Sequence, residues 1–185
     1  MKNEEDIIAE IQKDDWMMEI LYIVQTLNLP DWWVCAGFVR SKIWDTQHHF
    51  SKRTPLPDID VIYYDSVNAV EEEEKKWEGV LKSIAPKLPW SVKNQSRMHL
   101  KNQLPPYSSS IDGISKFPET ATALGVKLGK EKNVVLAAPW GVEDVIKMEV
   151  RATPFYKSNL KRIYQDRVMK KNWQSIWSKV KIYDI

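Results

Sequence analysis

Two aspartates at the entrance of an apolar run place the strongest constraint on how this chain can fold. The stretch "TPLPDIDVIYYD" (54–65) carries Asp58 and Asp60 on either side of one isoleucine, ahead of the β-branched and aromatic residues that strands favour. Because every second side chain of a strand points the same way, both carboxylates should lie on one face of a sheet. Carboxylates held that close raise each other's pKa, so a protein that keeps such a pair needs a compensating charge.

A divalent cation would supply that charge. Mg²⁺ prefers oxygen ligands, keeps several of its waters, and is usually held by one or two carboxylates together with substrate phosphates. The pair therefore predicts a site for Mg²⁺ (or Mn²⁺) in which Asp58 and Asp60 are the metal ligands and the catalytic carboxylates. The alternative is that Asp58 only begins the strand after Pro57, while Asp60 lies on a solvated edge.

A second motif lies about twenty residues upstream, in "CAGFVRSKIW" (35–44). Ala36 and Gly37 form a small pair at a predicted junction between a strand and a helix, where backbone amides can approach an anion closely. Arg40 follows one turn into the helix and could grip a phosphate with its guanidinium, or pair with a surface carboxylate instead. The order of the motifs predicts a phosphate-binding turn followed by a metal-binding strand.

Together, "AGFVRSKIW" and "PDIDVIYYD" resemble the signature of the DNA polymerase β-like nucleotidyltransferase superfamily, close to the "GGxVRD…DxD" form of CCA-adding enzymes. Three later blocks resemble a family of small bacterial predicted nucleotidyltransferases: "VKNQSRMHLKN" (92–102), "FPETATALGVKL" (117–128) and "APWGVEDVIKMEVRATP" (138–154). The resemblance covers about residues 33–177, which is most of the chain.

The resemblance implies an α+β fold, with a small mixed sheet that carries the D-x-D motif and helices packed around it. It also implies a reaction in which an acceptor hydroxyl attacks the α-phosphate of a nucleoside triphosphate and pyrophosphate leaves. By position, Gly37 would contact phosphate with help from Arg40, and Asp58 and Asp60 would hold Mg²⁺.

The chain departs from the superfamily pattern in three ways, one of which is Ser41 at the position where the CCA-adding form has Asp. The turn is Ala36-Gly37, where relatives have Gly-Gly or Gly-Ser. Many members also carry a third carboxylate on a neighbouring strand, whereas the corresponding segment here, "WSVKNQ" (90–95), has no acid. Glu119, Glu143 and Asp144 are the other candidates for a third acid. Without one the acceptor hydroxyl has no evident general base, so a weak or inactive nucleotide-binding protein is the alternative function.

Two basic segments remain open to different interpretations. Lys93 and Asn94 belong to a polar block that could line the triphosphate or acceptor site, or could simply form a solvated junction. The final helix is rich in lysine and arginine and could bind nucleic acid, but the net charge of only +2 favours a solvated face. We therefore expect a nucleoside triphosphate and a small-molecule acceptor as partners, with nucleic acid possible but not favoured.

Length and composition fit one domain. We expect a single nucleotidyltransferase-like domain over 1–185, with an N-terminal helix (1–30), an α/β core (31–150) and a C-terminal helical segment (151–185). A single cysteine, Cys35 in an apolar run, and an acidic N-terminus favour a cytoplasmic protein, and no apolar stretch is long enough to cross a membrane. Apolar and charge patterns predict helices over 3–28, 38–47, 68–85, 141–150 and 159–180, strands over 31–37, 58–64 and 88–95, and a hairpin over 120–139.

Overall fold

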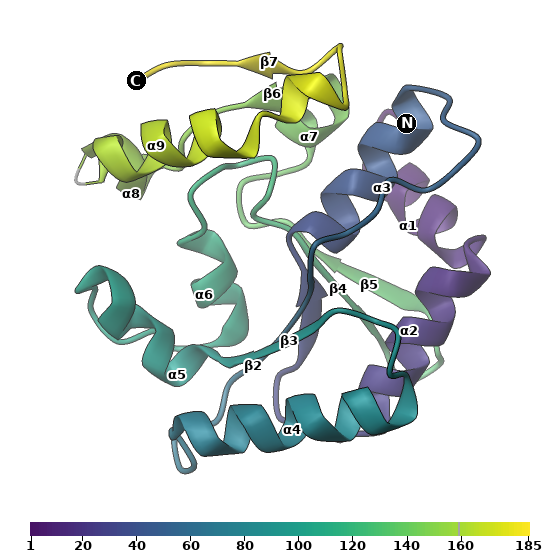
Figure 1. Ribbon diagram of the computed structural model, residues 1–185, viewed down its shortest axis with the longest axis vertical. Helices are drawn as coiled ribbons and strands as arrows, with labels where there is room; N and C mark the ends of the chain where they lie inside the picture. Colours follow the sequence, from purple (N-terminus) through teal and green to yellow (C-terminus); the bar gives the residue numbers. More distant parts are fainter. Residues whose placement is uncertain (159) are drawn as a thin grey trace.

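The computed structural model describes residues 1–158 and 160–185 and has a five-stranded mixed sheet at its centre (Figure 1). The strands lie in the order β3-β2-β1-β4-β5. Only β2 and β3 are parallel, and the other neighbours in the sheet are antiparallel. The strand bounds are β1 Trp33–Cys35, β2 Ile59–Tyr63, β3 Trp90–Asn94, β4 Gly125–Leu128 and β5 Val134–Ala137. The predicted α+β class, its small mixed sheet and the hairpin over 120–139 are confirmed.

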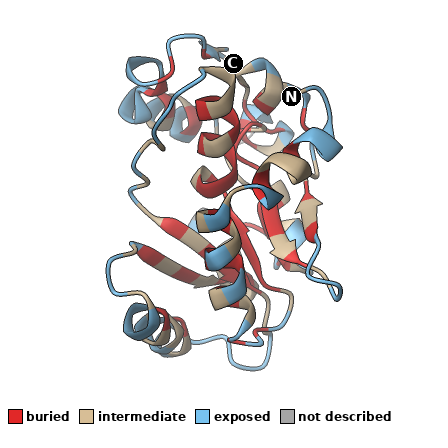
Figure 2. Ribbon diagram, turned by 90° about the vertical axis from the view of Figure 1, so that its right-hand side faces the viewer, coloured by how far each residue is buried: buried red, intermediate tan, exposed pale blue. Residues whose placement is uncertain are grey.

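One face of the sheet is covered by α1 (Glu4–Gln12), α2 (Asp15–Gln25) and α4 (Glu71–Ile84), and it forms the main core. Alternate residues of the strands, such as Val34, Val61 and Val92, are fully buried there. Figure 2 shows the buried residues on the sheet and on the helix faces turned toward it, with exposed residues on the loops and outward faces. Burial of these apolar side chains supplies the main driving force for the fold.

The other face of the sheet is covered by shorter segments. They are α5 (Gln95–Met98), the 3₁₀ turn η1 (His99–Asn102) and α6 (Ser110–Ser115). A smaller apolar cluster lies beneath them and includes Trp33, Cys35, Ile62 and Ile114. This second face also carries Asp60, because Cys35 and Asp60 are paired across β1 and β2 and their side chains share one side of the sheet.

The C-terminal segment forms a layer beside the end of α3 (Gly37–Gln47). It contains α8 (Pro154–Ser158), α9 (Lys161–Lys171), η2 (Trp173–Ser175) and β7 (Lys181–Ile182). Strand β7 pairs in parallel with β6 (Glu149–Val150), which follows α7 (Glu143–Lys147). Among the described residues, no helix combines the length and apolar character that a membrane span requires.

Three of the predicted helices are wrong in extent. The helix predicted over 141–150 is only α7, because Met148 adopts a left-handed conformation (φ 57°, ψ 40°) and the next two residues form β6. The segment 3–28 is two helices. The first, α1, ends at Gln12, and Asp14 then caps the start of α2 by accepting a hydrogen bond from the Met17 amide. The helix predicted over 159–180 ends at Lys171, since Asn172 adopts a left-handed conformation (φ 44°, ψ 45°) and turns the chain back into the core. Asn159, the first residue of that prediction, lies outside the described residues.

Candidate active site

The two aspartates lie where the sequence predicts, at the start of β2. Asp58 directly precedes the strand and Asp60 is its second residue. Burial, and then the negative charge of Asp58, raise the pKa of Asp60 to about 6, and a hydrogen bond with Ser91 opposes the shift. Burial and a like charge disfavour the ionised form of Asp60, and a cation between the two carboxylates would reverse this effect.

Cys35 is the neighbour of Asp60 on β1 and is fully buried. Its thiol donates a hydrogen bond to the Asp60 carbonyl oxygen at 3.6 Å. Burial raises the pKa of Cys35 well above its ordinary value, and the charges of Asp60 and Asp58 add to the effect. The thiol therefore stays protonated at neutral pH and is not a nucleophile.

The small turn follows β1 directly, so the sheet register places it beside Asp60. Ala36 has φ 57° and ψ −119°, a conformation that glycine adopts far more readily than alanine. Gly37 begins helix α3, and a Cβ built on it would lie 3.6 Å from the Arg40 Nη2 atom and 3.9 Å from Leu56. These are ordinary contacts, so packing within the protein does not require glycine here.

Arg40 is buried against three tryptophan rings. Its guanidinium carbon lies 5.1 Å from the ring centroid of Trp44, 4.9 Å from that of Trp173 and 5.9 Å from that of Trp177. Aromatic faces attract a cation and offset part of the cost of its burial. Burial lowers the pKa of Arg40 to about 10, a fall opposed first by Glu119, so the group remains charged at neutral pH.

The polar contacts of Arg40 connect this cage to the turn. Nη1 donates to the Thr122 hydroxyl at 3.2 Å, and Nη2 is the atom next to Gly37. The Nε atom is buried without a hydrogen-bond partner among the described residues. The guanidinium therefore lies beneath the turn, where its charge acts on any anion that binds the start of α3.

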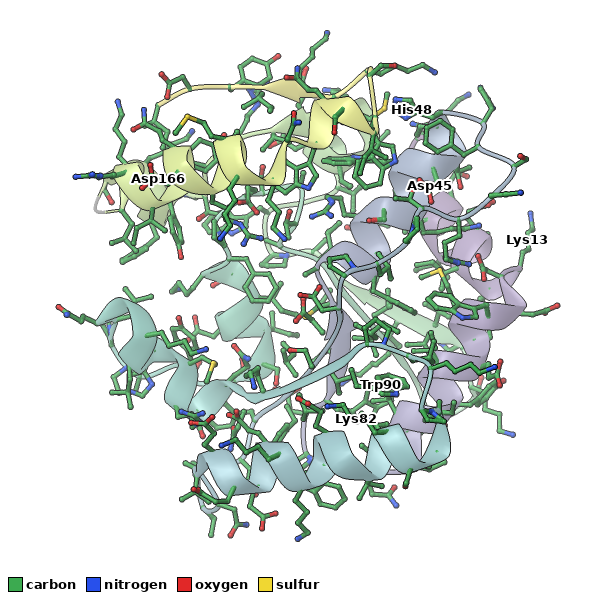
Figure 3. All side chains as sticks on the ribbon, viewed as in Figure 1. Lys13, Asp45, His48, Lys82, Trp90 and Asp166 are labelled. Carbon is green, nitrogen blue, oxygen red and sulfur yellow. The ribbon has the colours of Figure 1, made fainter. Side chains whose placement is uncertain are left out.

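The C-terminal segment holds this cage in place through Asp45. The Asp45 carboxylate accepts hydrogen bonds from the Trp177 indole at 2.8 Å and from the Thr54 amide at 2.9 Å. Figure 3 shows Asp45 and His48 at the end of α3 that faces the C-terminal segment, and the Lys179 amide donates to His48 at 3.1 Å. One carboxylate thus links the tryptophans around Arg40 to the loop that leads into Asp58.

A cavity of about 300 Å³ opens in front of Asp60 and is lined by residues of α5, α6, α8 and α9. Of the predicted site residues, Ala36, Asp60 and Lys93 line it. Its other cationic side chains come from distant parts of the chain, and its apolar wall includes three aromatic rings. The remaining lining residues are Ile62, Gln95, Met98, Lys101, Tyr107, Gly113, Lys116, Phe117, Pro118, Thr122, Tyr156 and Arg167.

Arg167 of α9 is the residue of this cavity that the sequence least suggests, because it lies more than a hundred positions after Asp60. It donates a hydrogen bond at 2.5 Å to Glu119, which is fully buried. The positive charge of Arg167 lowers the pKa of Asp60, and the negative charge of Glu119 raises that of Arg40. The charged side chains that line the cavity are thus Asp60 and four cations, Lys93, Lys101, Lys116 and Arg167.

Asn94 lies on the opposite side of β3 from the cavity. Ser91 and Lys93 pair with Asp60 and Ile62 and share their face, so the intervening and following residues point away. The Asn94 side chain is fully buried, donates to the Asp65 carbonyl at 2.7 Å and accepts from the Asp65 amide at 3.0 Å. Both ends of its amide are engaged, so contact with a phosphate would require these bonds to break.

None of the three candidates for a third acid joins the pair. Glu119 is bonded to Arg167, Asp144 is bonded to Thr120 and Arg151, and Glu143 is exposed beside Lys147. Within the part of the chain that the structure describes, no three acidic, histidine or cysteine side chains are grouped as metal ligands. A cation at Asp58 and Asp60 would therefore complete its coordination with water or substrate oxygens, as Mg²⁺ commonly does.

Comparisons with known proteins agree with this geometry. A sequence model of the nucleotidyltransferase family matches residues 22–182. The chain belongs to this family. The solved structure of a protein described as revealing a CCA-adding enzyme head domain is 36% identical, with a TM-score of 0.87 over 100% of this chain and 98% of that one. The predicted polymerase β-like nucleotidyltransferase fold is thus confirmed.

More distant structural neighbours of this chain include CCA-adding enzymes. One in complex with CTP is 12% identical with a TM-score of 0.59, and the match covers 99% of this chain but 44% of that one. The Thermotoga maritima enzyme complexed with tRNA is also 12% identical, with a TM-score of 0.58 over 99% of this chain and 43% of its own. The chain spans less than half the length of these enzymes, and at this identity they show the fold alone. A comparison with curated protein sequences finds no match.

Proposed function

We propose that this protein is a metal-dependent nucleotidyltransferase that transfers a nucleoside monophosphate from a nucleoside triphosphate to an acceptor hydroxyl, with release of pyrophosphate. The observation that carries the proposal is the placement of Asp60 beside the turn at Ala36 and Gly37, in a cavity lined with cationic side chains, with Asp58 directly before the same strand. Carboxylates for a metal and cations for phosphates on one sheet face are what this chemistry requires.

Asp58 and Asp60 would hold Mg²⁺ (or Mn²⁺). The raised pKa of Asp60 shows that the protein alone does not compensate the two charges, and this fits a site built for a cation. When bound, the metal would activate the attacking hydroxyl and stabilise the leaving pyrophosphate. The aspartates would fix its position against β2, and the hydrogen bond with Ser91 would orient Asp60.

The phosphates would bind where the cationic groups converge. The start of α3 at Gly37 is a favourable place for an anion, whereas the Ala36 amide already donates to the Leu124 carbonyl at 3.0 Å. Arg40 would add its charge from beneath the turn, and Lys93 and Arg167 would neutralise phosphate oxygens from the cavity wall. Asn94 is the weakest of the proposed contacts, and its hydrogen bonds suit it better to holding the start of α5.

The acceptor would be a small molecule. A cavity of about 300 Å³ lies at the lower end of the range for ligand pockets and must hold both substrates. Neighbours in complex with CTP, ATP and tRNA share the fold, but they are more than twice as long as this chain. Nucleic acid therefore remains a less favoured partner, and a cytoplasmic location remains part of the proposal.

One observation favours a second function: the residue that pairs with Asp60 on β3 is a serine, not an acid. Ser91 occupies the place where a third carboxylate could accept the proton of the acceptor hydroxyl. A serine cannot act as a base at neutral pH, so a catalytically weak or inactive nucleotide-binding protein of the same fold is the alternative.

Calorimetric titration with each nucleoside triphosphate, with and without Mg²⁺, tests the proposal. We expect Mg²⁺-dependent binding by the wild-type protein and none by the Asp58→Asn/Asp60→Asn double variant, while Glu143→Gln on exposed α7 serves as the matched control. Binding that survives the double substitution would remove the metal site from the proposal. Pyrophosphate release measured on the same samples with candidate acceptors separates the enzyme from the inactive alternative.

A further inference from the structure

Gln95, the first residue of α5, carries a buried amide that the fold does not use. The residue is 3% exposed and lines the cavity that contains Asp60. Among the described residues, none forms a hydrogen bond with the Gln95 side chain, whereas both ends of the neighbouring Asn94 amide are bonded. The amide nitrogen and oxygen of Gln95 are not among the fully buried polar atoms that lack a partner, so they open onto the cavity, where a ligand can pair with them.

A glycine on the facing helix fixes where this amide lies. A Cβ built on Gly113 of α6 would fall 2.5 Å from the Gln95 Oε1 atom and 3.1 Å from its Cγ and Cδ atoms. Real Cβ atoms do not approach other atoms that closely, so any larger residue at 113 would displace the amide. Glycine also weakens a helix by roughly 0.5–1 kcal/mol relative to alanine, so close approach to Gln95 explains its presence there.

The surroundings of Gln95 in the cavity suit a flat, partly apolar group. Met98, Tyr107 and Phe117 line the same cavity, and the aromatic rings provide surfaces on which a base can stack. Gln95 follows Ser91, the neighbour of Asp60, by four positions along the chain, which corresponds to about 13 Å of extended strand. The metal-binding and amide-bearing parts of the cavity are therefore separate.

We propose that Gln95 reads the edge of the nucleobase and makes the nucleotide site base-selective, an inference that rests on the proposed nucleotidyltransferase function. A carboxamide offers one acceptor beside one donor, and it pairs with a base edge that offers the complementary order. Gly113 is then a positioning residue, since it allows the Gln95 amide to lie at the required depth.

Calorimetry with the four nucleoside triphosphates and with inorganic triphosphate, all with Mg²⁺, tests this role. In Gln95→Met, which keeps the length of the side chain but loses the amide, we expect about tenfold weaker binding of the preferred nucleotide and a smaller difference among bases. Binding of inorganic triphosphate, which has no base, should stay within twofold. Gly113→Ala should reproduce both results, and Gln12→Met on exposed α1 is the matched control.

Unchanged base preference in both variants would overturn the role of Gln95 while leaving the nucleotidyltransferase proposal intact. Equal weakening of nucleotide and inorganic triphosphate would also overturn it, because the amide would then act on phosphates or on the fold. If the wild-type protein bound none of the nucleotides with Mg²⁺, both proposals would fail. Amide NMR spectra of Gln95→Met and Gly113→Ala establish that each variant is folded before binding is compared.

Discussion

Replacing Asp60 by asparagine should stabilise the metal-free protein while it removes the metal site. The substitution keeps the shape of the side chain and its capacity to bond with Ser91, but it removes the charge that Asp58 and burial oppose. Its effect on the free energy of unfolding follows from the pKa of Asp60, which is about 6 in the folded protein against an ordinary 3.8. Each pKa unit corresponds to about 1.4 kcal/mol, so the gain at pH 7 is about 3 kcal/mol.

The sign of the pH dependence follows from proton binding. Folded protein holds the Asp60 proton more tightly than unfolded chain, so protonated Asp60 contributes stability that is fully present below about pH 4 and is lost as the pH rises through about 6. The difference between Asp60→Asn and wild type should therefore be largest at pH 7 and fall below about 1 kcal/mol at pH 4.

Urea unfolding in EDTA at pH 4, 5, 6 and 7 measures this difference. In a separate thermal unfolding experiment at pH 7, the melting temperature of Asp60→Asn should lie roughly 6–12 °C above that of wild type for a chain of this size. Asp166→Asn is the matched control, because Asp166 is exposed on α9 and its stability effect should be near zero at every pH (Figure 3). Added Mg²⁺ should stabilise wild type only.

The reasoning would be refuted if Asp60→Asn were no more stable than wild type at pH 7, or if the difference did not shrink on acidification. Either result would mean that the fold already compensates the Asp60 charge, which would remove the physical ground for a cation there. A gain that appeared equally in the Asp166→Asn control would point to the net charge of the chain instead.

Three further substitutions test the structure around the site by urea unfolding. Ala36→Gly should raise the free energy of unfolding by about 1 kcal/mol, because φ 57° strains alanine, and a loss would show that the turn is unstrained. Arg167→Met should lower it by about 3 kcal/mol by leaving buried Glu119 unpaired, and adding Glu119→Gln should recover most of that loss. Trp177→Phe should cost about 1–2 kcal/mol through the lost indole hydrogen bond to Asp45, with an unchanged value contradicting that link.

Local patterns were sufficient to predict the two motifs and much of the sheet. The D-x-D run is a strand because its apolar alternation continues through Tyr63, and the small pair at 36–37 must end a strand and begin a helix. Their contact was also foreseeable, since a strand leading into a phosphate-binding turn belongs beside the acidic strand. In the structure, the two motifs are in contact through the pairing of Cys35 with Asp60.

The rest of the site depends on contacts between segments that are distant in the sequence. Arg167 and Lys116 reach the cavity from α9 and from the end of α6, and nothing in their local sequence distinguishes them from solvated basic residues. Two of the three tryptophans around Arg40, Trp173 and Trp177, are equally distant, because the chain must turn back at Asn172 before Trp173 can reach Trp44. Asn94 shows a third limit: its face on β3 follows from the register with β2, which the sequence does not specify.

The most direct test of the metal-binding pair is paramagnetic broadening of amide NMR signals by Mn²⁺ in the presence of a nucleoside triphosphate. If Asp58 and Asp60 hold the metal, the first signals to broaden should be those of Ile59 and of Cys35 and Ser91, the neighbours of Asp60 in the sheet. The Asp58→Asn/Asp60→Asn variant should lose this pattern. Broadening centred on the acidic start of α4 (71–74), or unchanged broadening in the double variant, would contradict a metal site at the aspartate pair.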